Sequence, residues 1–342
     1  MSQASPAAGP RACDEPLYRA YDVALLDLDG VVYIGGKAIP GASQALRQAS
    51  GEGMGLAYVT NNAYRTPAAV AQILTGLGIA ARADDVVTSA QAAARLLAER
   101  LPAGAPVLVV GGMGLRIALR ERGLRPVSTA AEQPAAVVQG YSPHVDYLLL
   151  AEGGLAVAAG ALFVGSNGDL TLPGPHGRQP GNGAMLKVIS AATGRQPLIA
   201  GKPEPPLHRE SVIRTGARHP LVVGDRLDTD IEAAQRVGAD SLLVLTGVTG
   251  AAEAVLAPPH QRPTYLAEDL SGLVEPHPAV IAEAGGFRCG GWTARWDGDR
   301  FELSGQGPRI DALRALCAAA WPAGTVSPDQ ITQALKTLDA SS

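Results

Sequence analysis

The chain has 342 residues, a length that suggests two domains with room for a small third one. Apolar residues make up 46% and charged residues 18%, a globular composition that is too apolar for a disordered chain. Lys and Arg number 28 against 32 Asp and Glu, and the net charge of −4 argues against a protein that coats nucleic acid or an anionic membrane.

The cysteines and the first residues favour a cytoplasmic protein. Cys13, Cys289 and Cys317 are odd in number and far apart, so we predict neither a disulfide framework nor a zinc site. The first fifteen residues hold no apolar run of the kind that a secretory signal needs, and the longest apolar stretch, about 153–168, is too short to span a bilayer. We therefore expect a cytoplasmic location, with neither membrane nor nucleic acid as a partner.

Strands alternate with helices along much of the chain, which is typical of a parallel α/β sheet. Residues 1–13 are rich in Ser, Ala and Pro and predict a flexible tail. The run DVALLDLD, which starts at Asp22, then predicts a buried parallel strand with acidic residues at its carboxyl edge. Thr66 and Pro67 predict the N-cap and the first residue of a helix. The other elements expected here are helices over 40–51 and 228–237 and strands over 55–59, 220–225 and 241–245.

Residues from about 86 to 180 repeat this alternation and predict a separate inserted α/β domain, because a crossover between parallel strands needs only about a dozen residues. Its expected elements are helices over 90–100, 114–122 and 147–159 and strands over 106–112, 135–139 and 161–167. Residues 258–279 are rich in proline and predict a linker. Beyond it, WTARWDGDRFELSG predicts a hairpin that turns at Asp297-Gly298, and 310–320 predicts a helix.

The predicted fold class is therefore α/β. We expect a Rossmann-like, doubly wound parallel sheet with an inserted α/β domain and a small α+β unit at the C-terminus. The predicted segments are the tail 1–13, a discontinuous core of 14–87 and 181–260, the inserted domain 88–180, the linker 261–279 and the C-terminal unit 280–342.

The segment DLDGVVYIG carries the strongest chemical signal. Asp27 and Asp29 are two residues apart, so they share one face at the end of a strand, where α/β sheets bind ligands. Gly30 allows a sharp turn directly after them. Two carboxylates this close fit a site where one binds a cation and the other keeps a proton. A calcium loop is the alternative reading, but VVYIGGKAI lacks the further ligands that such a loop needs.

Two later segments offer contacts to an anion. VTNN places Thr60, Asn61 and Asn62 at the end of the second strand, where a hydroxyl and a backbone amide can hold phosphate oxygens. An Asx-type turn is the alternative there. GKPEP places Lys202 in a loop bounded by Gly and Pro, either as a point charge for an anionic group or as a solvated surface charge.

The segment GDRLDTDI adds further carboxylates. Asp225 ends the third strand, and Asp230 lies in the first turn of the next helix. An acidic residue in a first helical turn can simply complement the helix dipole, which is the reading we prefer for Asp228. Asp225 has no such explanation, because it ends a strand.

In order and spacing, these segments resemble motifs one to four of the haloacid dehalogenase-like (HAD) superfamily: Asp27-x-Asp29-Gly30, Thr60-Asn61-Asn62, Lys202, and Gly224-Asp225 with Asp230. The strings VTNN, GKP and GDRLDTDI, with the insert between motifs two and three, are similar to the NagD and p-nitrophenyl phosphatase-like branch over about residues 20–270. The resemblance implies that 88–180 is a cap domain. It also implies a Mg²⁺-dependent phosphatase that acts on a small phosphorylated metabolite.

The resemblance also implies a role for each residue. Asp27 attacks phosphorus and forms an aspartyl phosphate, while Asp29 protonates the leaving alkoxide and then takes a proton from water. The implied Mg²⁺ ligands are Asp27, the backbone carbonyl of Asp29, and Asp225. The residues implied at the phosphate and around it are Thr60, the amide of Asn61, Lys202 and Gly30, with Asn62 and Asp230 orienting their neighbours. An acid at position 29 favours hydrolysis over dehalogenation or an ATPase-type phosphoenzyme, and the large insert argues against a mutase.

By the same resemblance, the segment Ser166–Gly183 is the substrate-specificity loop. Within it, Asn167, Asp169, Leu172 and His176 are candidate substrate contacts. For each one an ordinary turn or a plain loop surface is the alternative. We expect the Asn that precedes Gly183 to cap the following helix.

A capped core with an added C-terminal unit resembles the actinobacterial glycerol 3-phosphate phosphatases, so glycerol 3-phosphate is the expected substrate. Phosphoglycolate, pyridoxal phosphate, a sugar phosphate, or a silent sensor of phosphometabolites are the alternatives. Related capped enzymes imply a homodimer formed through the cap. The C-terminal unit resembles a truncated GNAT-type acetyltransferase, but SGQGPR lacks the fuller acyl-CoA loop pattern, so a structural or regulatory appendage is preferred to a second enzyme.

Overall fold

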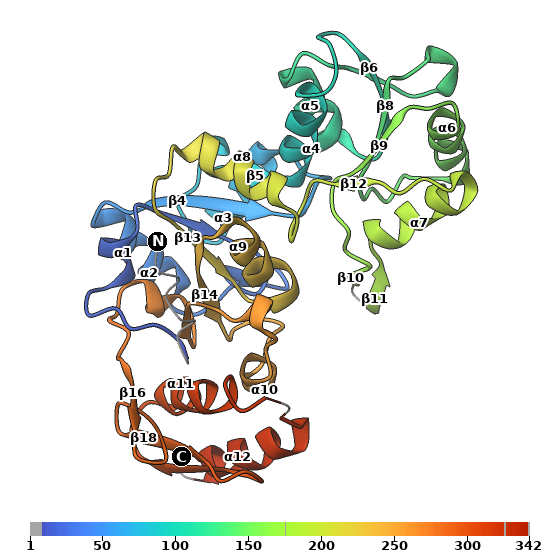
Figure 1. The fold of residues 1–342 in the computed structure, drawn as a ribbon. Coiled ribbons are helices and arrows are strands. Elements are labelled where there is room, and N and C mark those ends of the chain that lie inside the picture. The colour runs from blue at the N-terminus through green and yellow to red at the C-terminus, as the bar shows by residue number, and fades with distance from the viewer. Residues whose placement is uncertain (1–8, 175, 325, 341–342) are drawn as a thin grey trace, which may run out of the picture. The chain divides into compact units, whose positions relative to one another are not determined.

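The structure, a computed structural model, describes residues 9–174, 176–324 and 326–340. The chain divides into two compact units (Figure 1). The first unit consists of the residues up to Leu56 together with those from Ala217 onward, and the second unit is Ala57–Gly216. We describe each unit by itself.

Four parallel strands form the sheet of the first unit, in the order β15-β14-β13-β1. Their bounds are β1 (Val23–Leu26), β13 (Pro220–Gly224), β14 (Asp240–Val244) and β15 (Tyr265–Ala267). Every residue of β1 is buried, as expected for a parallel strand that is covered on both faces. Leu26 lies opposite Val223, so β1 and β13 end side by side. The predicted α/β class is confirmed.

Short elements complete this part of the first unit. The helices are α1 (Leu17–Ala20), α2 (Ala42–Gly51), α9 (Glu232–Val237) and α10 (Ala251–Val255), and β2 (Tyr33–Ile34) pairs with β3 (Lys37–Ala38). The helix predicted over 228–237 is different at its start, because Leu227–Ile231 form a π-helical turn before α9. Gly238 ends α9 in a left-handed conformation, as its position after the last apolar residue predicts.

The predicted linker and part of the predicted flexible tail pair with other segments of the first unit. The proline-rich segment 258–279, predicted as a linker, contains β15, which adds an edge strand to the sheet. Prolines are compatible with an edge strand, since one side of it needs no backbone donors. Within the predicted tail, the Arg11 amide donates to the Thr264 carbonyl at 2.8 Å. The backbone of Cys13 forms an isolated antiparallel β-bridge with the backbone of His277. Residues 1–8 of that tail lie outside the described residues.

The C-terminal unit contains more helices and strands than predicted. The hairpin of β18 (Trp292–Trp296) and β19 (Phe301–Gly305) and the helix α11 (Arg309–Ala320) were expected, whereas β16 (Val280–Glu283), β17 (Gly286–Cys289) and α12 (Pro328–Ala340) were not. The four strands form one antiparallel sheet, against which α11 packs (Figure 1). An apolar cluster joins Leu243 and Leu266 of the parallel sheet to Trp292 and Leu313, so this unit shares a core with the parallel sheet.

A buried polar network also ties α11 to the parallel sheet. The Arg314 guanidinium donates to the Leu266 carbonyl, to Asp311 at 2.7 Å and to Nδ1 of His277 at 3.1 Å. The other ring nitrogen of His277 lies 2.8 Å from the Gly272 carbonyl oxygen. A neutral ring that accepts from Arg314 and donates to Gly272 satisfies all of these bonds. Burial lowers the pKa of His277 to about 4.

This network predicts an acid-sensitive attachment of the C-terminal unit. The folded-state pKa of His277 lies below the ordinary value of 6.5, so the unfolded chain binds a proton first as the pH falls. The stabilisation is present above about pH 6.5 and is lost toward pH 4, with about 2 kcal/mol lost between pH 7.5 and 5. Urea unfolding of the wild type and of His277→Gln at several pH values measures how much of the pH dependence of the free energy of unfolding comes from His277. His208 is half-buried, and desolvation lowers its pKa to about 4 as well, so equal slopes in both proteins would contradict the assignment to His277.

The second unit contains a five-stranded parallel sheet in the order β12-β9-β8-β6-β7 and a parallel pair, β4 with β5. The strands are β4 (Gly55–Thr60), β5 (Val86–Thr88), β6 (Pro106–Val110), β7 (Arg125–Val127), β8 (Ala136–Gln139), β9 (Leu162–Gly165) and β12 (Leu198–Ile199). The helices are α3 (Pro67–Gly76), α4 (Ser89–Ala98), α5 (Met113–Glu121), α6 (Tyr147–Ala158), α7 (Asn182–Thr193) and α8 (Pro205–Thr215). Thr66 caps α3 through a bond from the Ala69 amide, as predicted.

Within the predicted specificity loop, β10 (Thr171–Gly174) and β11 (Gly177–Pro180) form an antiparallel hairpin. Their sequence gave no strand signal, because Gly and Pro interrupt the alternation of apolar and polar residues. Among the described residues, no helix is both long and apolar enough to cross a membrane.

Candidate active site

The aspartates of the first unit stand where neighbouring strands end. Asp27 follows β1, and its amide donates to the Val223 carbonyl of β13 at 2.8 Å. Asp225 follows β13 and is 1% exposed. Because β1 and β13 are adjacent and parallel, their carboxyl ends bring these two side chains to one edge of the sheet.

A third carboxylate joins them. Oxygens of Asp27, Asp225 and Asp230 all lie within 4.8 Å of one another. The π-helical turn places Asp230, which is 1% exposed, back against the end of β13. Gly224 makes this possible, because a Cβ there would lie 2.1 Å from the Cβ of Asp230. We had expected Asp230 only to orient its neighbours, whereas its position makes it a candidate ligand as well.

This cluster suits a hard divalent cation. All of its donors are carboxylate oxygens, which Mg²⁺ prefers. Three carboxylates at this distance, two of them buried, repel one another unless positive charge compensates them. The residues present therefore fit the predicted Mg²⁺. The backbone carbonyl of Asp29 as a further ligand stays a prediction.

Asp29 begins the tight turn that Gly30 completes. Gly30 has φ +89°, and a Cβ there would lie 2.3 Å from Oδ2 of Asp225. Both the turn and the close approach therefore require glycine. Asp29 is exposed, but desolvation by the surrounding chain raises the pKa of its carboxyl above the ordinary value. A carboxyl of this kind is suited to carry a proton.

Sequence reasoning missed the loop that follows β14. The Val248 amide donates to Oδ2 of Asp225 at 2.7 Å, and the Thr246 hydroxyl donates to the Gly30 carbonyl at 2.5 Å. A Cβ on Gly247 would lie 2.0 Å from Asp225, so the loop approaches this carboxylate with bare backbone. The available signal was a Thr-Gly pair directly after a predicted parallel strand, at the edge where the other candidates end.

In the second unit, Asn61 binds the loop that carries Lys202. Its Oδ1 accepts from the Lys202 amide at 2.8 Å, and its Nδ2 donates to the Lys202 carbonyl at 3.2 Å. Lys202 is 7% exposed, and its Nζ donates to the Val59 carbonyl at 3.2 Å. The reading of Lys202 as a solvated surface charge is therefore wrong.

Thr60 and Asn62 shape the turn after β4. The Thr60 hydroxyl accepts from the Asn62 amide at 3.1 Å. Oδ1 of Asn62 accepts from the amides of Tyr64 and Arg65, which is the Asx-type turn that we had kept as the alternative. Asn62 thus holds the backbone conformation, and a direct phosphate contact from it stays a prediction.

Two candidates of the specificity loop are tied to Asn61. Asn167 is 5% exposed and donates to the Asn61 carbonyl at 2.8 Å, while Asp169 accepts from the Asn61 Nδ2 at 3.1 Å. Asn182 does not cap α7 with its side chain as expected. It is the first residue of that helix, and its Nδ2 donates to the Asn167 carbonyl at 2.7 Å. These side chains link the loop to the Lys202 segment.

The other two candidates lie on the hairpin. Leu172 is half-buried on β10 opposite Gln179, and His176 is exposed in the turn between β10 and β11. Neither is joined to the Asn61 network by a described hydrogen bond. Their contact with substrate stays a prediction.

Family models match three parts of the chain. Residues 24–125 match a haloacid dehalogenase-like hydrolase, and residues 199–273 match a second HAD-hydrolase-like model. Residues 289–339 match a GCN5-related N-acetyltransferase-like domain.

Relatives across the chain are phosphatases by name. A D-glycerol 3-phosphate phosphatase of Mycobacterium tuberculosis is 45% identical over 311 residues, which cover 89% of this chain and 86% of the relative. An acid sugar phosphatase of Staphylococcus saprophyticus is 39% identical over 260 residues, which cover 75% of this chain and 97% of the relative. About a quarter of this chain therefore has no counterpart in the second relative.

A solved structure agrees with these matches. The crystal structure of a glycerol phosphate phosphatase from Mycobacterium tuberculosis in complex with magnesium superimposes with a TM-score of 0.85 at 41% identity. The superposition covers 94% of this chain and 98% of that one.

Proposed function

This chain belongs to the haloacid dehalogenase-like hydrolase family, and from that premise we propose that it is a Mg²⁺-dependent phosphatase of a small phosphorylated metabolite. The observation that carries the proposal is the cluster of Asp27, Asp225 and Asp230, whose oxygens lie within 4.8 Å of one another. Relatives named phosphatases support it across most of the chain.

We propose glycerol 3-phosphate as the substrate. The support is the Mycobacterium tuberculosis relative, which is named for that substrate and matches 89% of this chain. A sugar phosphate is the second candidate, because the acid sugar phosphatase matches at 39% identity. The two differ in size, so the specificity loop decides between them.

The proposed reaction has two halves. The Asp27 carboxylate attacks phosphorus, the P–O ester bond breaks, and Asp29 donates its proton to the leaving alkoxide. Water then attacks the aspartyl phosphate, Asp29 takes the proton, and inorganic phosphate leaves with the Asp27 carboxylate restored. Asp27, Asp225 and Asp230 would hold Mg²⁺, which when bound supplies positive charge to the phosphoryl oxygens.

The remaining contacts to the phosphoryl group are proposed for Thr60, Asn61 and Lys202. We assign Thr60, the Asn61 amide and the Lys202 ammonium to the oxygens of the transferring phosphoryl group. Two structural features support this assignment of Lys202. Burial limits its contact with water, and bonds from Asn61 on both sides of its peptide unit hold its backbone.

A metal-dependence experiment tests the proposed function. We expect phosphate release from glycerol 3-phosphate to stop under EDTA and to return with added Mg²⁺. Asp225→Asn should raise the Mg²⁺ concentration for half-maximal rate by at least about tenfold, because it removes one anionic ligand. Release that is unchanged under EDTA would refute the proposal. If calorimetry shows that glycerol 3-phosphate binds in the presence of Mg²⁺ but no inorganic phosphate is released, the alternative of a silent sensor would be favoured.

The Asn61 network predicts that Asp169 acts by positioning. Asp169→Ala leaves the Asn61 side-chain amide without one of its acceptors, which loosens the Lys202 segment. We expect kcat to fall about tenfold with little change in KM. Steady-state kinetics on glycerol 3-phosphate measure both, with Asp84→Ala, an exposed aspartate of the same unit, as control. A rise in KM at constant kcat would instead mean that Asp169 contacts substrate.

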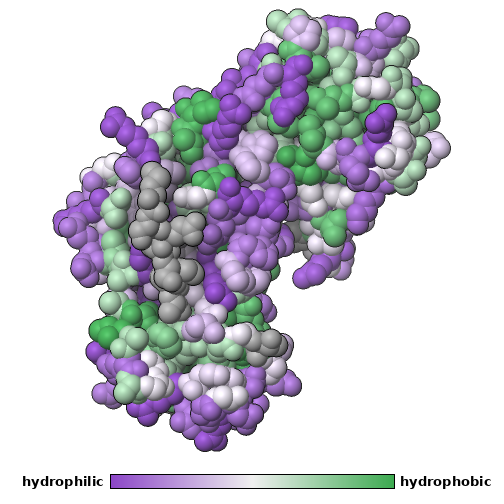
Figure 2. All heavy atoms as spheres, viewed as in Figure 1, coloured by the Kyte–Doolittle hydropathy of each residue, from purple (hydrophilic) through white to green (hydrophobic). Residues whose placement is uncertain are grey.

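We also propose that residues 88–180 are a cap and that the protein dimerises through it. Four strands of the five-stranded sheet, β6 to β9, lie within these residues and support the first proposal. The proposed dimer is supported by Tyr147, Leu148 and Leu155 of α6, which are 81%, 71% and 62% exposed, and Figure 2 shows apolar side chains on the visible face of the second unit.

A cytoplasmic location is proposed on the three cysteines, none of which forms a disulfide.

A further inference from the structure

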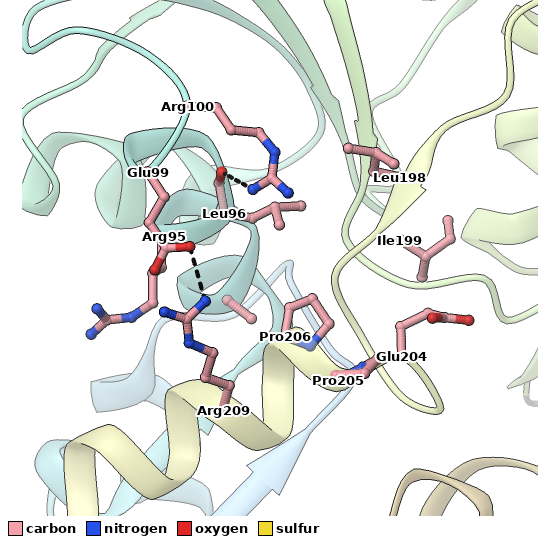
Figure 3. Close-up of a pocket in the computed structure, with 11 residues that line it drawn as sticks. Arg95, Leu96, Glu99, Arg100, Leu198, Ile199, Glu204, Pro205, Pro206 and Arg209 are labelled. Atoms are coloured by element: carbon pink, nitrogen blue, oxygen red, sulfur yellow. Dashed lines mark hydrogen bonds and ion pairs between the residues drawn. The ribbon is translucent and has the colours of Figure 1, made fainter. Parts of the chain in front are cut away.

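The second unit contains a cavity of about 360 Å³. One face of α4, strand β12 and the start of α8 surround it (Figure 3). Of the described residues that line it, none is among the active-site candidates. Its volume is in the range of sites for small organic ligands.

One part of the cavity wall is apolar. Leu96 faces it from α4, Leu198 and Ile199 lie on the opposite side, and Pro205 and Pro206 lie below (Figure 3). Leu198 is 43% exposed, so part of its apolar surface is open to a ligand. An apolar ligand body would cover it.

Three arginines, Arg95, Arg100 and Arg209, line the cavity together with two glutamates. Arg209 is paired with Glu99 at 3.2 Å and Arg95 with the buried Glu210.

Of the three arginines that line the cavity, Arg100 is the one that we assign to an anionic ligand. One nitrogen of its guanidinium donates to the Leu96 carbonyl at 2.9 Å, and no carboxylate of the described residues forms an ion pair with it. A guanidinium has five N–H donors, so the remaining ones are available to an anion.

We propose that this cavity binds a small amphipathic organic anion. The carboxylate or phosphate group of the ligand bonds to Arg100, and its apolar body lies between Leu96 and Leu198. The apolar body of such a ligand also contacts Pro205 and Pro206, which follow Lys202 by three and four residues. Occupancy therefore restrains the segment that carries Lys202, which makes the cavity a regulatory site.

Isothermal calorimetry on the full chain tests the binding chemistry. Octanoate combines both features, acetate has the charge alone, and n-octanol has the apolar body alone. We expect octanoate to bind and the other two to bind at least about tenfold more weakly. Octylphosphonate, a second arm, distinguishes a phosphate-type from a carboxylate-type ligand. Equal affinity for octanoate and acetate, or no octanoate binding at 10 mM (roughly the weakest useful affinity), would overturn the proposal.

Variants locate the site. Arg100→Ala and Leu198→Asp should each weaken octanoate binding at least about tenfold, because each removes one half of the recognition. Arg120→Ala, an exposed arginine of α5 outside the cavity, should leave it unchanged. Both tested side chains are exposed, so the variants are expected to fold, and their melting temperatures check this. Hydrogen exchange of residues 200–206 should slow with octanoate in wild type only. Binding that survives both variants would contradict the assignment, whether or not the protein is a phosphatase.

Discussion

Replacing Asp27 by Asn is expected to lower phosphate release from glycerol 3-phosphate by at least about 10⁴-fold. The amide has no anionic oxygen with which to attack phosphorus, so no aspartyl phosphate forms. It also removes one anionic donor from the cluster with Asp225 and Asp230. Initial rates of phosphate release at saturating Mg²⁺ measure the loss, and mass spectrometry of acid-quenched enzyme tests for the covalent intermediate.

Asp228→Asn is the matched control. Asp228 lies in the same acidic segment as Asp225 and Asp230, but its side chain is 61% exposed and pairs with Arg226. It should therefore keep wild-type turnover. Retained turnover in Asp27→Asn would end the proposed mechanism. Equal losses in both variants would show that the experiment reports on folding rather than on the nucleophile.

The sequence predicted the strand ends well because these positions follow a simple rule. Asp27 and Asp225 each come directly after a run of buried apolar residues, and such runs are neighbouring parallel strands in an α/β sheet. Both aspartates therefore lie at one edge. The N-cap Thr66 was predictable for a similar reason, since its signal lies within three residues along the chain.

The remaining features depend on contacts between distant residues. Asp230 enters the carboxylate cluster through a π-helical turn, which no propensity distinguishes from an ordinary first turn of a helix. Asn61, Asn167 and Asp169 were assigned to phosphate or substrate, yet much of their hydrogen bonding joins residues more than a hundred positions apart. Strand β15 was hidden because prolines mark both linkers and edge strands.

Glu210 is the clearest feature without a sequence signal. It lies on α8 and is fully buried, and its carboxylate accepts from the guanidinium groups of Arg95, Arg122 and Arg214. These three arginines come from α4, from the end of α5 and from α8 itself. A single carboxylate thus joins three helices of the second unit. Along the sequence, each member looks like an ordinary surface charge.

Glu210→Gln is therefore expected to lower the free energy of unfolding by about 3–5 kcal/mol. The substitution preserves shape but leaves three partly buried guanidinium groups without a negative partner. Urea unfolding followed by far-UV circular dichroism measures the shift in midpoint. Glu99→Gln is the matched control, since Glu99 forms a more exposed pair with Arg209 on the same unit and should cost less than about 1 kcal/mol.

The salt dependence further distinguishes the buried ion pairs of Glu210 from the more exposed pair of Glu99. Screening by 1 M NaCl weakens exposed pairs and affects buried ones much less, so the effect of Glu99→Gln should vanish while that of Glu210→Gln persists. If Glu210→Gln costs no more than Glu99→Gln, the three guanidinium groups must be stabilised by water instead, and the proposed role of Glu210 in joining the helices would be wrong. If the large cost is observed, the same carboxylate also explains why Arg95 is held in place at the wall of the cavity, which leaves Arg100 as the cation that an anionic ligand can reach.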